Sequence, residues 1–569
     1  MNKIQLYNNQ IVVSCERLDN ETLRIINENA DLYPVHSNRL KTEFKFSPRL
    51  VPEVLRCFRG ITEENIEDAP IGVQQAYYIE MRRRRALAEL KKTGPVGNPA
   101  VNELITLEPH QQLGREIAQV FDKFAFFYDT RTGKTPMSLS IIRDDVLQHP
   151  GNKWLVVCPL ILIENAWVQD AERFFPELRV VNCHAATKAK RLEQIAKDAD
   201  VYVTNTESFV TYSPYFIDKN IVGAFVDESS DMKSPKSKVS KALVEYAQTC
   251  QRFYLLSGTP APNGEQEYFM QMRAIDYFCM PQSYAQFKEH FFTNTSWNPQ
   301  YEKLAIKQDC KEELMSLIKS RALYVDKEDV LDTPGRTFHE VIVDMPNDVL
   351  KAYRTMKNKM SMSVGPDNKI TATSAAAMLN KLNQISSGFV MDTQAAKENA
   401  FYDEHKQEWY LLNDFRFTAL LELLDSPALR GQQVLIWANY RVEFQQIKRL
   451  LGDMCRCIYG GTTIEEKNEA IRLFKEGKVQ YLVANPASAD KGLTLTNAHI
   501  CVYFSLNWSY ELYKQSMERI YGAKRSQPLH CHYYVLLCEG TVDTMLYREV
   551  LETKASVSTA VLNHLKGGV

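Results

Sequence analysis

The sequence contains no Cys-x-x-Cys pair, although 12 cysteines are spread over its 569 residues. Only Cys455 and Cys457 lie close together, so neither a zinc framework nor a disulfide scaffold is expected. Scattered thiols of this kind are typical of a reducing compartment. The cysteine pattern therefore favours a cytoplasmic protein without a structural metal.

No hydrophobic run is long enough to cross a membrane. The longest one, residues 154–163, has about half of the roughly 20 residues that a bilayer requires, and it suits a buried strand instead. The first ten residues, MNKIQLYNNQ, contain no apolar signal-peptide core. Neither membrane insertion nor secretion is expected.

The chain has almost no net charge. Its 68 Lys and Arg residues nearly balance 70 Asp and Glu residues, giving a charge of -2. Any attraction to nucleic acid must therefore be local. The hydrophobic share of 45% and the charged share of 24% are typical of a folded chain and exclude a disordered one. At roughly 150 residues per domain, the length predicts three or four compact units.

A Gly- and Pro-rich stretch at residues 93–100 predicts the first boundary. Residues 1–97 then form a small α+β accessory domain, with a hairpin from Ile4 to Cys15, a helix beginning at Ser47-Pro48 and a longer helix over about 70–92. That last helix could bind DNA phosphates through a basic ridge, or it could be an ordinary solvated face. The basic residues of this ridge are Arg82, Arg83, Arg84, Arg85, Lys91 and Lys92.

Short strand-like runs alternate with helical segments in two separate regions, which predicts an α/β fold with two doubly wound parallel-sheet lobes. The first lobe spans 98–285, with strands near 124–128, 155–158, 201–204, 224–226 and 253–256. The second spans 430–569, with strands near 433–437, 455–458, 481–484, 500–504 and 532–537. The helix-rich segment 286–429 is expected to be an insertion and linker between the lobes.

The strand at 124–128 runs into Asp129-Thr-Arg-Thr-Gly-Lys-Thr135, which opens a helix. A tight loop between a strand and a helix N-terminus binds phosphate through backbone N–H groups, here around Thr132 and Gly133. Lys134 would neutralise the β- and γ-phosphates, and the Thr135 hydroxyl would bind Mg²⁺. This loop predicts a triphosphate site.

A pair of carboxylates, Asp227 and Glu228, ends another buried strand. Doubly wound sheets bind ligands at the carboxyl ends of their strands. Asp227 can complete the Mg²⁺ shell, and Glu228 can orient or deprotonate the attacking water. An acidic pair can equally cap a helix N-terminus, and both interpretations can hold together.

In order along residues 101–550, the motifs resemble those of superfamily 2 helicase-like ATPases, and within them the Swi/Snf-type DNA translocases in the form of compact phage or bacterial members. The resemblance implies RecA-like lobes, ATP and Mg²⁺ as cofactors, DNA as partner and a bacterial or phage-infected cell. The matching segments are Leu107-Glu-Pro-His-Gln111 for the Q motif, 227–238 for an extended motif II, Leu256-Ser-Gly-Thr-Pro260 for motif III, 485–495 for motif V and Gln515-Ser-Met-Glu-Arg519 for motif VI.

The resemblance also implies residue roles. Gln111 would read adenine, Gly492 would line the nucleotide site, and Arg519 would reach the γ-phosphate. The implied DNA contacts are Thr206, Lys233, Lys236 and Thr259.

Three residues depart from the family pattern: Arg131 where glycine is usual, Ser230 where histidine often follows Asp-Glu, and Gly522 at the position of a second motif VI arginine. Arg525 could supply the missing guanidinium if the helix ends early. The leading hypothesis is an ATP-dependent double-stranded DNA translocase. The alternatives are a strand-separating or fork-remodelling helicase, and an ATP-dependent DNA clamp or scaffold with little turnover.

Overall fold

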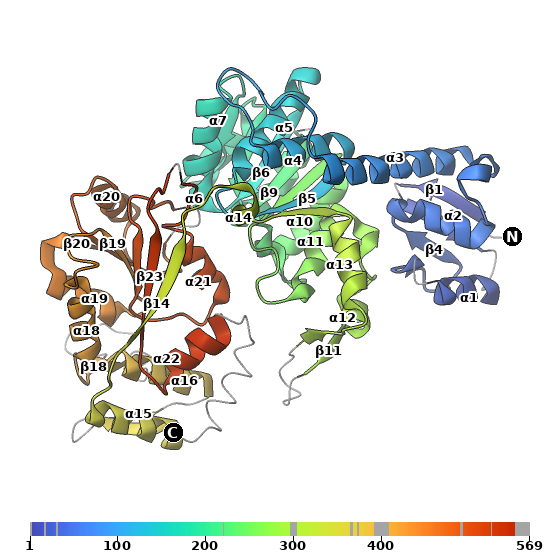
Figure 1. Cartoon of the computed structure of the whole chain (residues 1–569). Helices are drawn as coiled ribbons and strands as arrows, with labels where there is room; N and C mark the ends of the chain where they lie inside the picture. The colour runs from blue at the N-terminus through green and yellow to red at the C-terminus, as the bar shows by residue number, and fades with distance from the viewer. Residues whose placement is uncertain are drawn as a thin grey trace. The chain divides into compact units, whose positions relative to one another are not determined.

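The chain folds into two compact units, Met1–Leu331 and Asp332–Val569 (Figure 1). In this computed structural model the described residues are 3–8, 10–15, 19–29, 32–219, 221–295, 304–364, 368–371, 375–391, 409–489, 493–524 and 526–551. The break between the units falls inside segment 286–429, which the sequence predicted to be one insertion. Residues 286–331 belong to the first unit, and the rest of that segment belongs to the second.

The first unit begins with a four-stranded antiparallel sheet in the order β1-β2-β4-β3. The predicted hairpin is confirmed, and its turn places Asn8 at a φ of 46°. Helices α1, α2 and α3 accompany the sheet, and the predicted long helix is α3 (Figure 1). The bounds are β1 Lys3–Tyr7, β2 Gln10–Ser14, α1 Asn20–Glu28, β3 His36–Ser37, β4 Glu43–Phe46, α2 Val51–Arg59 and α3 Ile71–Thr93.

This N-terminal domain is anchored firmly to the rest of the first unit. Arg49, which is 9% exposed, donates to the carbonyls of Ser320 at 3.0 Å and Lys123 at 2.9 Å. The Ser47 hydroxyl donates to Asp276 at 2.5 Å, and Arg321 pairs with the same carboxylate at 2.7 Å. Because Asp276 and Arg321 are buried, removing residues 1–92 would leave polar groups of the first lobe unsatisfied. The Gly- and Pro-rich stretch therefore does not mark a loosely tethered domain.

The body of the first unit is a parallel sheet in the order β13-β5-β10-β9-β6-β8-β7. The five predicted strands are confirmed, while β7 and β13 were not predicted. The strands are β5 Lys123–Tyr128, β6 Lys153–Cys158, β7 Val180–Asn182, β8 Val201–Asn205, β9 Ile221–Asp227, β10 Arg252–Leu256 and β13 Ala322–Val325. The order and direction of the strands confirm a doubly wound, RecA-like lobe.

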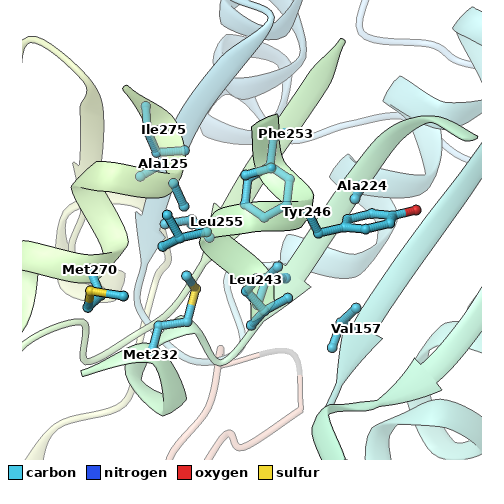
Figure 2. Close-up of a cluster of buried hydrophobic side chains, with 14 of the residues drawn as sticks. Ala125, Val157, Ala224, Met232, Leu243, Tyr246, Phe253, Leu255, Met270 and Ile275 are labelled. Carbon is cyan, nitrogen blue, oxygen red and sulfur yellow. The ribbon is translucent and has the colours of Figure 1, made fainter. Parts of the chain in front are cut away.

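Successive side chains of each strand point to opposite faces of this sheet, and helices cover both faces. On one face, Ala125, Val157, Ala224 and Leu255 meet residues from α10 and α11, such as Leu243 (Figure 2). The helices are α4 Pro109–Val120, α5 Lys134–Gln148, α6 Leu160–Leu162, α7 Gln169–Phe174, α8 Lys188–Ala196, α9 Thr206–Ile217, α10 Lys238–Thr249, α11 Tyr268–Ile275, α12 Tyr284–Phe291, α13 Lys311–Lys319 and α14 Lys327–Val330, and a hairpin is formed by β11 Phe292–Asn294 and β12 Leu304–Ile306.

The second unit contains a six-stranded parallel sheet in the order β14-β23-β22-β19-β21-β20, which confirms the second RecA-like lobe. The edge strand β14 was not predicted. The strands are β14 Arg336–Ile342, β19 Val434–Trp437, β20 Cys455–Ile458, β21 Tyr481–Ala484, β22 Ile500–Tyr503 and β23 Cys531–Leu537. The remaining elements are α15 Asn347–Lys359, β15 Ser361–Val364, β16 Asn368–Thr371, α16 Ala375–Ser386, β17 Phe389–Met391, β18 Trp409–Leu411, α18 Phe415–Leu424, α19 Arg441–Leu451, α20 Ile464–Lys475, α21 Tyr510–Met517 and α22 Val542–Thr544.

Across the part of the chain that the structure describes, no helix is both long enough and apolar enough to span a membrane.

Candidate functional site

The candidate site lies at the carboxyl edge of the first unit's parallel sheet. β10 pairs with β5 on one side and β9 on the other. The loops that follow these three strands therefore emerge side by side at one edge. They are the phosphate loop after β5, the Ser257–Pro260 turn after β10, and the Asp227-Glu228 pair at the end of β9.

The phosphate loop turns tightly because two of its residues have a positive φ, and a hydrogen bond within the loop supports the turn. Gly133 has a φ of 77°, and Arg131 has a φ of 64°. Arg131 thus adopts the left-handed conformation that glycine favours, at a cost of roughly 1–2 kcal/mol for a residue with a Cβ. The Thr132 hydroxyl donates to the Asp129 carbonyl at 2.7 Å. The family departure at Arg131 is therefore accommodated by strain in an otherwise ordinary loop.

Helix α4 packs against this loop through Gln111 and His110. The Gln111 amide donates to the Thr132 carbonyl at 2.9 Å, and its oxygen accepts from the Glu108 N–H at 3.0 Å. His110 Nε2 donates to the same carbonyl at 2.7 Å. Burial lowers the pKa of His110, which favours its neutral form. The structure places Gln111 at the loop as expected, while its reading of adenine stays a prediction.

Lys134 and Thr135 form the first turn of α5, directly after the loop. The Lys134 ammonium donates to the carbonyls of Tyr128 at 3.0 Å and Asp129 at 3.2 Å. Both carbonyls belong to the strand end and loop that a triphosphate would approach. The ammonium is thus held over the loop, where it can exchange these contacts for phosphate oxygens.

The Asp227 carboxylate is 4% exposed and is oriented by an indole. Trp167 Nε1 donates to Asp227 Oδ2 at 3.1 Å, and the Glu228 N–H donates to Asp227 Oδ1 at 3.0 Å. Glu228 has a φ of 55°, a strained conformation that is often found at functional sites. Trp167 itself is fully buried. Sequence reasoning did not predict that Trp167 fixes Asp227.

A buried glutamine joins the carboxylate loop to the turn after β10. Ser229 donates to Gln271 Oε1 at 2.8 Å, and Gln271 Nε2 donates to the Pro260 carbonyl at 2.6 Å. In the same turn, a Cβ at Gly258 would lie 3.2 Å from the Thr130 nitrogen of the phosphate loop. The three loops are therefore in physical contact. Sequence reasoning missed Gln271, whose only signal is a glutamine within the apolar helix α11.

The four DNA contacts that the resemblance implied lie at or near the same edge. Thr206 opens α9 after β8, and Thr259 lies in the turn after β10. Lys233 and Lys236 follow the carboxylate loop; Lys236 is exposed and Lys233 is half-buried. Ser230, the second family departure, is 1% exposed, and its hydroxyl has no hydrogen-bond partner among the described residues. The DNA contacts remain predictions.

Within the second unit, Arg519 is 7% exposed. Its guanidinium donates to the Leu493 carbonyl at 3.3 Å, and its own carbonyl accepts from the Leu495 N–H at 2.8 Å. These contacts tie the predicted motif VI to the end of the predicted motif V. Gly492 and Arg525, which were predicted to serve the same chemistry, lie outside the described residues.

The basic residues of α3 are largely engaged within the first unit. Arg83 pairs with Asp122 at 2.6 Å. Arg84 pairs with Glu53 at 2.7 Å and Glu80 at 2.9 Å, and Arg85 pairs with Glu63 at 2.7 Å. Arg82 is exposed and has no ion pair among the described residues. These ion pairs therefore argue against a continuous ridge of arginines available to DNA. Of the four arginines, Arg82 is the best placed to contact a DNA phosphate.

Replacing Arg84 with Ala should lower the unfolding free energy of the N-terminal domain by roughly 1–3 kcal/mol, because Glu80 would remain buried without its partner. Arg82→Ala should leave stability within about 0.5 kcal/mol.

If Arg82 contacts duplex phosphate, the slope of log affinity against log salt should fall by about 0.9 in Arg82→Ala. Urea unfolding measures the stabilities, and DNA binding at several salt concentrations measures the slope. An unchanged slope would show that Arg82 lies on a solvated face that does not contact DNA.

Sequence models of two protein families match the chain in succession. The SNF2-related domain matches residues 125–394, and the helicase conserved C-terminal domain matches residues 416–524. The first match begins within β5 and runs into the second unit, and the second match lies within that unit.

Similar proteins come from a phage and from animals. "Putative protein p41" of Acyrthosiphon pisum secondary endosymbiont phage 1 is 24% identical, over 76% of this chain and 93% of that protein. The human "DNA annealing helicase and endonuclease ZRANB3" is 24% identical, over 72% of this chain and 36% of that protein. A Xenopus tropicalis "SWI/SNF-related matrix-associated actin-dependent regulator of chromatin subfamily A-like protein 1" is 21% identical, over 88% of this chain and 50% of that protein. The chain thus spans half or less of these two animal relatives.

Among solved structures, the chain is similar to "Sulfolobus solfataricus SWI2/SNF2 ATPase core in complex with dsDNA", with 19% identity, a TM-score of 0.36 and coverage of 84% of this chain and 99% of that one. The chain is also similar to "Sulfolobus solfataricus SWI2/SNF2 ATPase core domain", with 19% identity, a TM-score of 0.38 and coverage of 82% of this chain and 93% of that one. Because the two family matches follow one another and together take up about two thirds of the chain, this protein belongs to the SNF2 family of helicase-like proteins.

Proposed function

We propose that this protein hydrolyses ATP and uses the energy to move along double-stranded DNA. One observation carries the proposal: Gln271 joins the Asp227-Glu228 loop to the turn that contains Thr259, and that turn touches the phosphate loop at Gly258. A change at the nucleotide would therefore be transmitted directly to a residue predicted to contact DNA. Such coupling is what a motor requires and what a passive binding domain does not need.

The residues present fit ATP with Mg²⁺. The Thr135 hydroxyl and the Asp227 carboxylate supply oxygen ligands, which Mg²⁺ prefers, and Trp167 fixes the orientation of the carboxylate. The cation would neutralise charge on the phosphates. Lys134 and the α5 N-terminus bind the phosphates, and Glu228 orients the attacking water and accepts its proton.

Duplex DNA is the proposed track because a near-neutral chain can bind sequence-independently through a few hydroxyls and lysines on the phosphate backbone. Thr206, Thr259, Lys233 and Lys236 are the proposed contacts. Arg519, together with Arg525, is proposed to stabilise charge at the γ-phosphate in the transition state. The similarity to a phage protein supports a role in the cytoplasm of a bacterial or phage-infected cell.

The decisive measurement is the steady-state ATPase rate of the full chain without nucleic acid and with single-stranded DNA, duplex DNA, forked DNA and RNA. We expect duplex to give the largest stimulation, and displacement of a triplex-forming strand to require ATP. A larger ATPase rate on forked DNA, together with strand displacement, would favour a fork-remodelling helicase. This helicase is the second candidate function because the human relative is named a DNA annealing helicase. Tight ATP-dependent DNA binding with no stimulated turnover would identify a clamp and overturn the proposal.

A further inference from the structure

Three side chains with metal-binding atoms converge in the first unit, away from the nucleotide site. His290 lies in the last turn of α12, and Cys310 and Glu313 lie at the beginning of α13. The ligand atoms of all three lie within 4.8 Å of one another. His290 Nε2 is 3.2 Å from both Glu313 oxygens, and the Cys310 sulfur lies 3.6 Å from the His290 carbonyl. All three side chains are half-buried.

The backbone enforces this convergence. α12 runs into β11 and β12 runs into α13, so the three residues flank the base of a β-hairpin. The Lys307 N–H closes that base by donating to the Phe291 carbonyl at 2.8 Å, and the Cys310 N–H donates to the Lys307 carbonyl at 3.1 Å. The cysteine and the histidine are therefore held together by the hairpin, although 20 positions separate them in the sequence.

Two neighbouring side chains, Tyr33 and Lys307, frame this cluster. Tyr33 of the N-terminal domain stacks on the His290 ring at 4.0 Å between centroids, which fixes the imidazole plane. Lys307, the nearby lysine, donates its ammonium to the Glu289 carbonyl at 2.7 Å, and among the described residues His290 is the ion-pair partner of Glu313. The site thus gathers a thiol and a carboxylate around one imidazole.

We propose that His290, Cys310 and Glu313 bind a structural zinc ion. A tetrahedral ion with ligands at about 2.0–2.3 Å separates neighbouring ligand atoms by roughly 3.3–3.7 Å. The His290 nitrogen and the Glu313 oxygens already lie 3.2 Å apart, and all three ligand atoms lie within 4.8 Å of one another. The combination of sulfur, imidazole nitrogen and carboxylate oxygen selects zinc over magnesium or calcium, which take oxygen ligands. Water would complete the fourth position. The ion would fasten α12 to α13 across the hairpin base.

The test uses the full chain, freed of metal by a chelator and titrated with Co²⁺, which reports thiolate ligation by a charge-transfer band. We expect about one equivalent to bind, with the band displaced by Zn²⁺. Cys310→Ser should abolish the band. Glu313→Gln, which keeps the thiol, should weaken Co²⁺ affinity at least about tenfold. Circular dichroism checks that each variant is folded.

Matched controls separate this site from other thiols and imidazoles. Cys57→Ser removes a half-buried thiol in α2, and Cys457→Ser removes one member of the thiol pair in β20. His532→Gln removes a ring that lies 3.1 Å from His339 in the second unit. All three controls should keep the band and the stoichiometry. A band that survives Cys310→Ser, or a folded wild-type chain that gives none, would overturn the proposal and leave His290 and Glu313 as an ordinary ion pair.

Discussion

Glu228→Gln is expected to slow ATP hydrolysis by about 10²- to 10⁴-fold while the protein still binds ATP, because the amide keeps the shape of the side chain but cannot accept the proton of the attacking water. Lys134→Ala is expected to abolish nucleotide binding, since the ammonium that lies over the loop carbonyls at 3.0 and 3.2 Å is the charge available to the phosphates there. Single-turnover hydrolysis and binding of a fluorescent ATP analogue measure the two effects separately.

Two exposed residues provide controls for this pair of variants. Glu245 lies on the exposed side of α10, and Lys188 lies at the beginning of α8. Glu245→Gln and Lys188→Ala change the same functional groups without touching the phosphate loop or the Asp227-Glu228 pair, so both should behave as wild type. Wild-type turnover in Glu228→Gln would show that another group activates the water, and unchanged ATP affinity in Lys134→Ala would show that the phosphates bind elsewhere.

The parts of the fold that the sequence predicted well are those in which local pattern and burial agree. The central strands β5, β6, β9 and β10 read as apolar runs because both of their faces are covered by helices. The edge strand β14 escaped prediction because its sequence RTFHEVI is mostly exposed and mixes charged with apolar residues. Its place in the sheet depends on pairing with β23, nearly 200 positions away, which no local pattern records.

The candidate site divides in the same way. The phosphate loop could be predicted because strand, loop, Gly133, Lys134 and helix follow one another directly along the chain. The contacts of Trp167 and Gln271 could not, because each depends on a neighbour 60 or 42 positions away in the sequence. For the arginines of α3 the sequence showed a charge run but not the carboxylates that neutralise it, which come from three other segments as well as from α3 itself. Tertiary partners, and not residue types, decide these roles.

The second unit depends on a buried arginine, and Arg416→Met is expected to destabilise it by about 3–5 kcal/mol. Arg416, at the beginning of α18, is 0% exposed and pairs at 2.5 Å with Asp543, which is 1% exposed. Methionine fills a similar space but leaves the carboxylate buried without its cation. The measurement is native-state hydrogen exchange of β22 and β23, which reports the second unit without assuming that the whole chain unfolds in one step.

An exposed pair supplies the matched control. Arg430 lies 3.0 Å from Asp425, and their side chains are 67% and 75% exposed. Because water screens such a pair, Arg430→Met should cost less than about 1 kcal/mol. Equal protection losses in the two variants would show that Arg416 contributes no more than an ordinary surface residue.

A double variant separates the buried charge from the other contacts of the same guanidinium. Arg416 also donates to the carbonyls of Phe504 at 2.7 Å, Leu536 at 2.8 Å and Ser386 at 3.0 Å. Adding Asp543→Leu to Arg416→Met removes the unpaired carboxylate, and apolar replacement of a whole buried pair is often neutral. The three carbonyls would still have lost their donor, and those that stay dry would carry part of the destabilisation. Partial recovery of protection is therefore expected. Full recovery would mean that water or local rearrangement satisfies the three carbonyls. No recovery would mean that the hydrogen bonds to these carbonyls, and not the charge pair with Asp543, account for the effect of Arg416.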